Sequence, residues 1–208
     1  MNDKQREKIL KALTQHARRA IKRGALTKYQ NVSKFGNECV YHDGFVSLSL
    51  PSDLVETKTA IDIRTKRDID RGVECIKLDD TTSYPYEQYS KSLDNYKSYE
   101  YSVEEFLYTL KDLKSDTWVE DDGIITISGN DDEFFNSFGF RFRTLDFATD
   151  GCTAVDVNYL LTIVKIMDIL GDKKVTLYLN MRNRLNPIML HSESVKGEVI
   201  PKLLGFSW

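Results

Sequence analysis

The stretch that decides the fold is Val155-Asp156-Val157-Asn158-Tyr159-Leu160-Leu161-Thr162-Ile163-Val164-Lys165-Ile166-Met167-Asp168-Ile169-Leu170. Its apolar positions are too dense for a surface stripe, so they predict a buried helix, and Gly171 predicts a left-handed cap at its end. Residues 173–179 then alternate polar and apolar, which is typical of a half-buried strand. A loop at 183–186 leads to a second predicted strand over 187–192, and Val199-Ile200-Pro201 is a third short apolar run.

Length and composition indicate a globular protein. The chain has 208 residues, 41% of them apolar and 29% charged, enough for one large domain or two small ones. No run is long enough to span a bilayer, and the N-terminus is charged where a signal peptide is apolar. We therefore expect a cytoplasmic protein without membrane contact. Cys39, Cys75 and Cys152 are spaced too widely for a metal knuckle or redox pair, which predicts ordinary reduced thiols and no cofactor.

Positive charge is concentrated at the N-terminus. Residues 3–23 contain eight Lys or Arg and two acids, a local net of +6, while the whole chain has a net charge of −3. The remainder therefore carries −9. An acidic body with one basic helix favours a localised anionic partner.

Residues 3–23 are predicted to form a helix, which Asp3 or Asn2 caps and Gly24 ends. At 100° per residue the apolar side chains fall on one side. A basic side lies opposite, formed by Lys4, Lys8, Lys11, Arg18 and Lys22. Lys and Arg side chains at this spacing can neutralise several phosphates without recognising bases. The alternative is a basic face that is only solvated. His16 lies at the border between the sides, where we expect a bystander.

A β-hairpin is predicted next. Asp43-Gly44 separates two β-rich runs, 38–42 and 45–50, and both turn positions favour positive φ. The hairpin brings His42 near Ser47 or Ser49, but nothing nearby supplies the sharp turn and orienting acid of a hydrolase. The pair is therefore not expected to be catalytic. Further strands are predicted at 61–63 and 73–78.

A polar, Tyr-rich stretch follows at 79–97, with no apolar period and one Pro. Its composition predicts an extended linker, and we place a domain boundary at residues 84–97, between a first domain at 1–83 and a second at 98–208. The six tyrosines between 84 and 101 could stack on bases or pack against the flanking domains.

The second predicted domain opens with a capping box, Ser102-Val103-Glu104-Glu105, that starts a helix. A second hairpin is predicted around Asp121-Asp122-Gly123, between 118–120 and 124–128. The acidic turn at 130–133 lacks calcium-loop spacing, so we expect a solvated loop and not a metal site. Residues 138–143 alternate Phe with Gly or Arg, which predicts a strand with an aromatic inner face.

The pattern of helix, short connection and hairpin occurs three times, at 3–50, 102–128 and 155–192. Repetition of this kind indicates similar units whose sheets pair to bury their faces. The last two units are close enough to form one domain of two pseudo-equivalent halves. We therefore predict an α+β fold of repeated helix plus antiparallel β-sheet units.

In order and spacing, these motifs resemble the bacterial β sliding clamps, the ring-shaped processivity factors of DNA polymerase. The resemblance is clearest in Tyr159-Leu160-Leu161, in the strand Asp172-Lys173-Lys174-Val175-Thr176-Leu177, and in 186–190 followed by 199–201. Residues 102–128 resemble the first half of a clamp domain, and the stretch from Tyr84-Pro85 to Glu100 resembles a linker between clamp domains. The resemblance covers 98–206, and residues 1–83 look like a degenerate clamp domain.

The resemblance implies a DNA-clamp fold whose basic helices meet duplex phosphates without sequence specificity. Here the helix with Lys4, Lys8, Lys11, Arg18 and Lys22 has that pattern. It also implies a hydrophobic pocket for partner peptides near the C-terminus, which carries over to Ile200, Pro201 and Leu203. Known clamps have three domains per chain and this chain has room for fewer than two, so either a ring would need a different number of subunits or no ring would close.

These points predict a non-enzymatic, clamp-like processivity factor, encoded by a phage or mobile element, that binds double-stranded DNA. DNA polymerase or other replication proteins would be its partners, and it would form a homo-oligomer through sheet edges. The alternative is an interaction protein that keeps a clamp-derived fold without encircling DNA, such as a host-replication inhibitor or a phage accessory protein. No paired acid and base, phosphate loop or nucleophile elbow indicates an enzyme.

Overall fold

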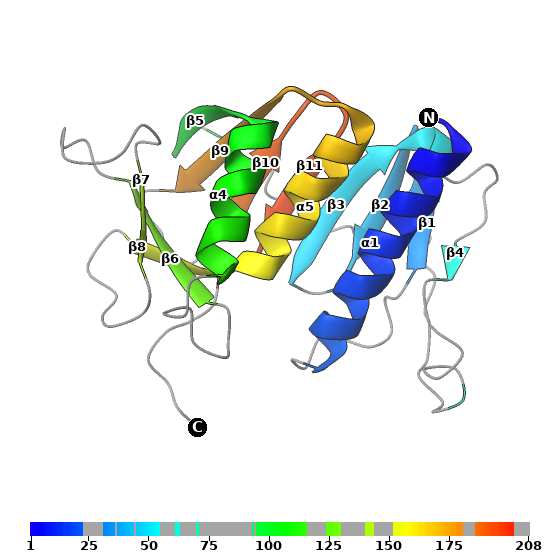
Figure 1. Cartoon of the computed structure of the whole chain (residues 1–208), viewed down its shortest axis with the longest axis horizontal. Helices are drawn as coiled ribbons and strands as arrows, with labels where there is room; N and C mark the ends of the chain where they lie inside the picture. Colours follow the sequence, from blue (N-terminus) through cyan, green and yellow to red (C-terminus); the bar gives the residue numbers. More distant parts are fainter. Residues whose placement is uncertain are drawn as a thin grey trace.

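Three helices lie side by side on one face of a large antiparallel sheet (Figure 1). They are α1 (Asp3–Lys22), α4 (Val103–Ser115) and α5 (Val157–Leu170). The computed structural model describes residues 1–22, 31–35, 37–43, 45–54, 61–62, 70, 93, 95–115, 124–129, 140–143, 152–180 and 186–201. Helices and antiparallel sheets together confirm the predicted α+β class.

The large sheet has eight strands in the order β4-β1-β2-β3-β11-β10-β9-β5. The strands are β1 (Asn31–Phe35), β2 (Glu38–His42), β3 (Val46–Pro51), β4 (Ile61–Asp62), β5 (Tyr96–Ser102), β9 (Lys174–Asn180), β10 (Ile188–His191) and β11 (Lys196–Val199). A short 3₁₀ helix, Ser52–Leu54, follows β3. Strands from both ends of the chain thus share one sheet, because β3 pairs with β11.

A second sheet has three strands in the order β7-β6-β8. It lies next to α4, on the side of α4 that faces away from α5 (Figure 1). Its strands are β6 (Ile124–Gly129), β7 (Phe140–Arg143) and β8 (Cys152–Asp156). The strand before α4 (β5) pairs with the strand after α5 (β9). In the same way, the strand before α5 (β8) pairs with the strand after α4 (β6). The two helix-containing halves therefore exchange strands, as pseudo-equivalent units would.

α1 begins with a reciprocal cap. The Gln5 N–H donates to Asn2 Oδ1 at 2.9 Å, and the Asn2 N–H donates to Gln5 Oε1 at 3.1 Å, so each side chain satisfies a backbone donor of the first turn. Ile9, Leu13 and Ala17 are buried beneath the helix. The predicted amphipathic helix at 3–23 is confirmed, with its end one residue earlier at Lys22.

The β2–β3 hairpin is also confirmed, and His42 pairs with Ser47 across it. Asp43 shapes the turn, because its Oδ1 accepts the N–H groups of Phe45 (2.9 Å) and Val46 (2.8 Å). A short polar side chain that binds the backbone two or three residues on is typical of such turns.

α4 starts where the capping motif predicts. The Glu105 N–H donates to Ser102 Oγ at 3.1 Å, and Phe106 and Leu110 are buried on the inner side of the helix. Tyr101 stacks on Phe106 with ring centroids 5.4 Å apart, which ties the start of α4 to the end of β5.

α5 is the buried helix that the sequence predicts, but it begins later. Val155 and Asp156 belong to β8, where Val155 pairs with Ile125. The prediction was wrong there because apolar density does not distinguish a buried strand from a buried helix. Asp156 caps the helix instead, as its Oδ1 accepts the Asn158 N–H at 2.8 Å. Gly171 has φ +90°, so the predicted left-handed cap is confirmed.

β3 and β11 form a seam between the N-terminal and C-terminal units, pairing Val46–Ser49 with Lys196–Val199. Gly197 lies opposite Leu48 and directly beneath α5. A Cβ built on Gly197 would lie 2.9 Å from Ile163 Cγ2 and 3.2 Å from Leu48 Cδ2. The missing side chain therefore lets α5 pack closely on the sheet at the seam.

Several sequence predictions lie outside the described residues. These are the strand at 73–78, residues 118–123 of the second hairpin, the acidic turn at 130–133, and most of the linker at 84–97. Tyr96 and Lys97, placed in that linker, instead belong to β5, because their backbone pairs with β9. The strand over 38–42 and those over 173–179 and 187–192 are confirmed to within one residue. The domain division at 1–83 and 98–208 stays a prediction.

Candidate nucleic-acid interface

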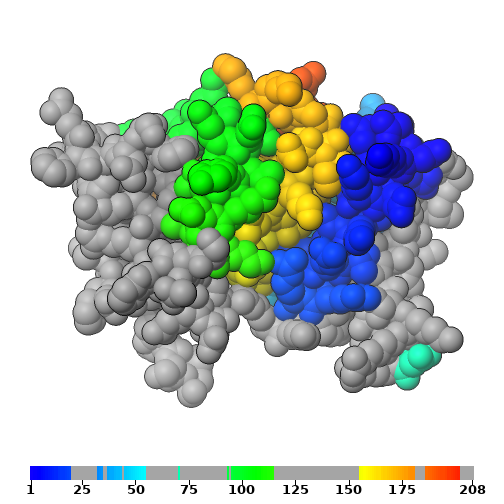
Figure 2. Space-filling view, viewed as in Figure 1, coloured from blue at the N-terminus to red at the C-terminus, as the bar shows by residue number. Residues whose placement is uncertain are grey.

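The outward side of α1 carries the predicted basic residues. Lys4, Lys8, Lys11 and Arg18 are all exposed, on the side opposite buried Ile9. Lys22 closes the helix, and its side chain lies outside the described part. From Lys4 to Arg18 the row spans about 20 Å at a helical rise of 1.5 Å per residue. Figure 2 shows this side of α1 together with the outward faces of α4 and α5.

α1 and α5 run antiparallel. Near one end the Gln5 Nε2 group donates to the Ile169 carbonyl at 3.0 Å, and near the other the Arg19 guanidinium donates to Asn158 Oδ1 at 3.1 Å. α4 runs antiparallel to α5 as well, since the Val103 N–H donates to the Lys173 carbonyl just past the end of α5. The C-terminal ends of α1 and α4 therefore lie at the same end of the helix layer as the start of α5.

The sequence analysis missed the cations that α4 and α5 add to this face. Lys111 and Lys114 are exposed on α4, and Lys165 is exposed on α5. Partial burial, and then the positive charges of Arg19 and Lys165, lower the pKa of Lys114. The three groups are thus close enough to interact, although they come from three helices. Helical periodicity indicates the outward side of one helix, but only the packing shows that three such sides meet.

The opposite end of the helix layer carries acids as well as cations. Glu104 and Glu105 are exposed in the first turn of α4, and Asp168 is exposed in the last turn of α5. Lys4 and Lys8 lie at this end too, because Gln5 bonds to Ile169, so the cations of α1 run along the whole length of the layer.

His16 is not the bystander that its border position predicts. The side chain is 1% exposed, with Nε2 2.8 Å from Asp43 Oδ2 and Nδ1 3.2 Å from Thr162 Oγ1. The prediction failed because the helical wheel does not show that the hairpin turn and α5 close over this position. His16 joins the two units and does not face the surface.

The predicted partner segment follows β11 directly. Ile200 is 44% exposed, its N–H donates to the Phe45 carbonyl at 2.8 Å, and Pro201 is half-buried. Phe45 stacks on Tyr159 with ring centroids 6.0 Å apart. Of the apolar run at 199–201, Val199 is the last residue of β11, and Ile200 and Pro201 lie beyond the end of that strand. Leu203 lies outside the described residues.

The Ser/His pair forms on the sheet face away from the helices, where His42 Nδ1 lies 2.7 Å from Ser47 Oγ. Burial lowers the pKa of His42. The neighbouring carboxylate of Asp43 is engaged by His16, Tyr41 and the turn N–H groups. Both residues of the pair lie in regular strands, so Ser47 is not on the exposed sharp turn that a nucleophile requires.

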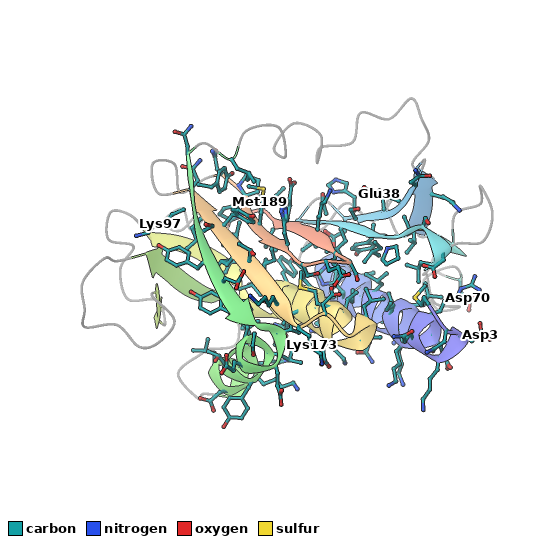
Figure 3. All side chains as sticks on the ribbon, turned by 90° about the horizontal axis from the view of Figure 1, so that it is seen from above. Asp3, Glu38, Asp70, Lys97, Lys173 and Met189 are labelled. Atoms are coloured by element: carbon teal, nitrogen blue, oxygen red, sulfur yellow. The ribbon has the colours of Figure 1, made fainter. Side chains whose placement is uncertain are left out.

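Glu198, on β11, pairs with Ser47 on one side and Met189 on the other, which places it on the same sheet face, away from α1, α4 and α5. Figure 3 shows Met189 and Glu38 on the side of the sheet away from the helices. Glu198 is 3% exposed, and its Oε1 has no hydrogen-bond partner among the described residues. Burial raises the pKa of Glu198 to about 8. Within the described ranges no three His, Cys, Asp or Glu side chains group as metal ligands.

None of the helices in the described parts of the chain is both long and apolar enough to cross a membrane. Neither a family model nor a curated protein matches the sequence.

Solved structures of bacterial clamps share the fold. DNA polymerase III subunit beta from Borrelia burgdorferi superposes with a TM-score of 0.52 at 14% identity, over 94% of this chain and 63% of that chain. The DNA polymerase beta subunit of Streptococcus pyogenes gives 0.50 at 11% identity, over 94% and 64%. The sliding clamp of Pseudomonas aeruginosa gives 0.50 at 14% identity, over 92% and 65%. This chain thus spans less than two thirds of each of them, and its fold is that of the DNA polymerase III β sliding clamps.

Proposed function

We propose that this protein is a clamp-like processivity factor that binds duplex DNA without sequence specificity through the helix face. The observation that carries the proposal is the row of exposed cations on α1, formed by Lys4, Lys8, Lys11 and Arg18, on a clamp fold. Long, solvated cations at helical spacing neutralise phosphates but do not distinguish base pairs. Lys22 would extend the row.

The partners follow from the same reasoning. A DNA polymerase or another replication protein would dock on the apolar segment formed by Ile200, Pro201 and Leu203. Because the chain spans less than two thirds of the clamps that it resembles, several copies would be needed to surround a duplex. We propose self-association through sheet edges, a phage or mobile-element origin, and no enzymatic activity.

The test of DNA binding is a charge-reversal variant, Lys8→Glu with Lys11→Glu and Arg18→Glu, measured by anisotropy on a labelled duplex. The wild type should bind unrelated sequences equally, with log K falling by about 0.9 per log unit of salt for each phosphate contacted. The variant should bind far more weakly and with a smaller slope. Binding equal to that of the wild type would overturn the assignment of the basic face.

Topological tracking needs a separate measurement. Mass in solution, with and without circular DNA, reports whether copies assemble into a ring. A ring should stay on a closed circle at a salt concentration that releases it from a linear duplex of the same length, because a ring slides off free ends.

A second candidate is a non-enzymatic interaction protein that keeps the clamp fold without encircling DNA, such as an inhibitor of host replication or a phage accessory protein. The net charge of −9 outside residues 3–23 favours this candidate, because most of the surface would repel phosphates. A monomer at all concentrations, without retention on circular DNA, would support it against the first.

A further inference from the structure

A buried carboxyl group lies in the seam between β3 and β11, on the sheet face away from the helices. It belongs to Glu198, whose neighbours across the strands are Ser47 on β3 and Met189 on β10, both buried (Figure 3). Glu198 Oε1 has no hydrogen-bond partner among the described residues. Such a position favours the neutral acid, because an ionised carboxylate without a partner costs far more to bury than the protonated group.

The titratable groups closest to this carboxyl on the neighbouring strands are neutral as well. Ser47 Oγ lies 2.7 Å from His42 Nδ1, and burial lowers the pKa of that imidazole. On β10, burial and then the charge of Lys196 lower the pKa of His191 to about 4. The His191 ring packs against Tyr178 of β9, with ring centroids 5.0 Å apart. Within the described part of this face, therefore, neither histidine supplies a positive charge to the seam at neutral pH.

The charged groups of the same face lie farther from the carboxyl and are engaged with one another. Lys196 Nζ lies 3.9 Å from Glu38 Oε1, and both side chains are about half exposed. Glu38 Oε2 also accepts a hydrogen bond from Ser49 Oγ at 2.7 Å. At the β5 edge of the sheet, Lys174 donates to Glu100 at 2.6 Å. An ionised Glu198 would thus have to compete with Glu38 for Lys196, the nearest cation of its own strand.

The seam has a particular place in the fold. Among the described strands it is the pairing that joins β1–β4 of the N-terminal unit to β5 and β9–β11 of the C-terminal unit. On the other face of the sheet the units are joined by helices, where Gln5 of α1 donates to Ile169 of α5 and His16 of α1 contacts Thr162 of α5. The two units could therefore part at the seam while α1 and α5 stay in contact.

We propose that Glu198 makes the seam a proton-dependent joint between the two units. The protonated carboxyl keeps β3 and β11 paired. When it releases its proton to solvent, the seam opens so that the carboxylate reaches water, and the contact between α1 and α5 is the hinge. This inference goes beyond the proposed function, because the joint needs neither DNA nor a partner protein.

The direction of the pH effect follows from the two states. Burial raises the pKa of Glu198 from 4.5 to about 8 in the closed seam, whereas the carboxyl is solvated in the open one. The closed seam therefore holds a proton that the open seam releases. The equilibrium constant for opening should rise by up to about tenfold per pH unit between 4.5 and 8, and it should level off above 8.

The test is amide hydrogen exchange of the full chain, followed by mass spectrometry from about pH 5 to about pH 9. Each rate is divided by the intrinsic rate at that pH, and the series is repeated in low concentrations of urea. Opening constants of the β3–β11 amides should rise with pH and depend little on urea, because a local opening exposes little surface. Amides of the β9–β10 pair should depend on urea as global unfolding does.

Two variants assign the pH effect. Glu198→Gln is neutral at every pH, so the opening of its seam should not change with pH. Glu193→Gln removes an exposed acid from the loop between β10 and β11, and it should keep the wild-type profile. If Glu198→Gln does not fold, the wild-type profile still decides, because the β9–β10 amides are its internal reference.

Three results would overturn the joint. Seam amides that follow urea as steeply as the β9–β10 amides would exchange only through global unfolding. Seam opening that does not change with pH in the wild type would remove the role of the proton. A pH dependence that persists in a folded Glu198→Gln variant would assign the proton to another group.

Discussion

His16 Nε2 and Asp43 Oδ2 lie 2.8 Å apart, and both side chains are buried where α1, α5 and the β2–β3 turn meet. The other ring nitrogen, Nδ1, lies 3.2 Å from Thr162 Oγ1, and the Thr162 hydroxyl donates to the Asn158 carbonyl at 2.8 Å. The imidazole of His16 thus bridges Asp43 of the hairpin turn and Thr162 of α5, one through each ring nitrogen. This pair connects the N-terminal unit to the turn and to α5.

Removal of either partner should destabilise the fold strongly. His16→Ala or Asp43→Asn leaves a buried group without its counterpart, and such losses cost about 3–5 kcal/mol. Urea denaturation of both single variants and the double variant measures the coupling, which should be large because the double variant removes both groups. Asp168→Asn, at an exposed acid, is the control. Additive losses would contradict direct pairing.

Acid should weaken the same pair. Burial raises the pKa of Asp43, but the hydrogen bond and charge of His16 and the N–H groups of Phe45 and Val46 outweigh it, so the pKa lies below the ordinary 3.8. A depressed pKa contributes stability above 3.8 that is lost as the pH falls through the folded value. The free-energy difference between the wild type and Asp43→Asn should therefore shrink below pH 3.8. An unchanged difference there would refute this assignment.

A rise in pH should destabilise the fold through ionisation of the buried Glu198. Burial raises its pKa from 4.5 to about 8, so the folded state holds a proton that the unfolded state releases. Stability should then fall as the pH rises from 4.5 toward 8, by up to about 1.4 kcal/mol per unit. Glu198→Gln, which is neutral throughout, should remove this fall, and thermal midpoints across the range measure it. Glu193→Gln, at an exposed site nearby, should behave like the wild type.

Gly197→Ala should destabilise the seam. The new Cβ would lie 2.9 Å from Ile163 Cγ2 and 3.0 Å from Ile163 Cδ1, so α5 would have to move away from β11. Overpacking of this kind costs about 1–3 kcal/mol. Ile163→Val removes the Cδ1 contact but keeps the Cγ2 contact. Gly197→Ala should therefore cost less stability in an Ile163→Val background than it does in the wild type. A neutral Gly197→Ala variant would mean that the seam packs more loosely.

Asp172 holds the loop between β10 and β11. Its carboxylate accepts hydrogen bonds from Ser192 Oγ at 2.5 Å and from Ser194 Oγ at 2.7 Å. Asp172→Ala leaves these donors unmatched and should lower the free energy of unfolding by about 1–3 kcal/mol. Ser194→Ala, which removes one of the two hydroxyl donors, should cost less. Equal losses in the two variants would assign the effect to Ser194 alone.

Local chemistry made several elements predictable. The alternation of apolar and basic residues in α1, the capping box at Ser102 and the glycine at 171 each depend on neighbours within one or two turns. The order of helices and strands was enough to indicate the clamp family, and the fold agrees with it. The candidate basic row was visible because helical periodicity is a property of the sequence alone.

Only the tertiary structure decided what depends on contacts distant in sequence. The pairing of β3 with β11 joins residues about 150 positions apart, and no local pattern specifies it. The same packing turned His16 from a border residue into a buried partner of Asp43, and it brought Arg19 to Asn158. A sequence determines which face of an element is apolar or charged, because that follows from backbone period. Which faces meet is decided by the packing of the whole chain, and the junction of the three helices is a consequence of that packing.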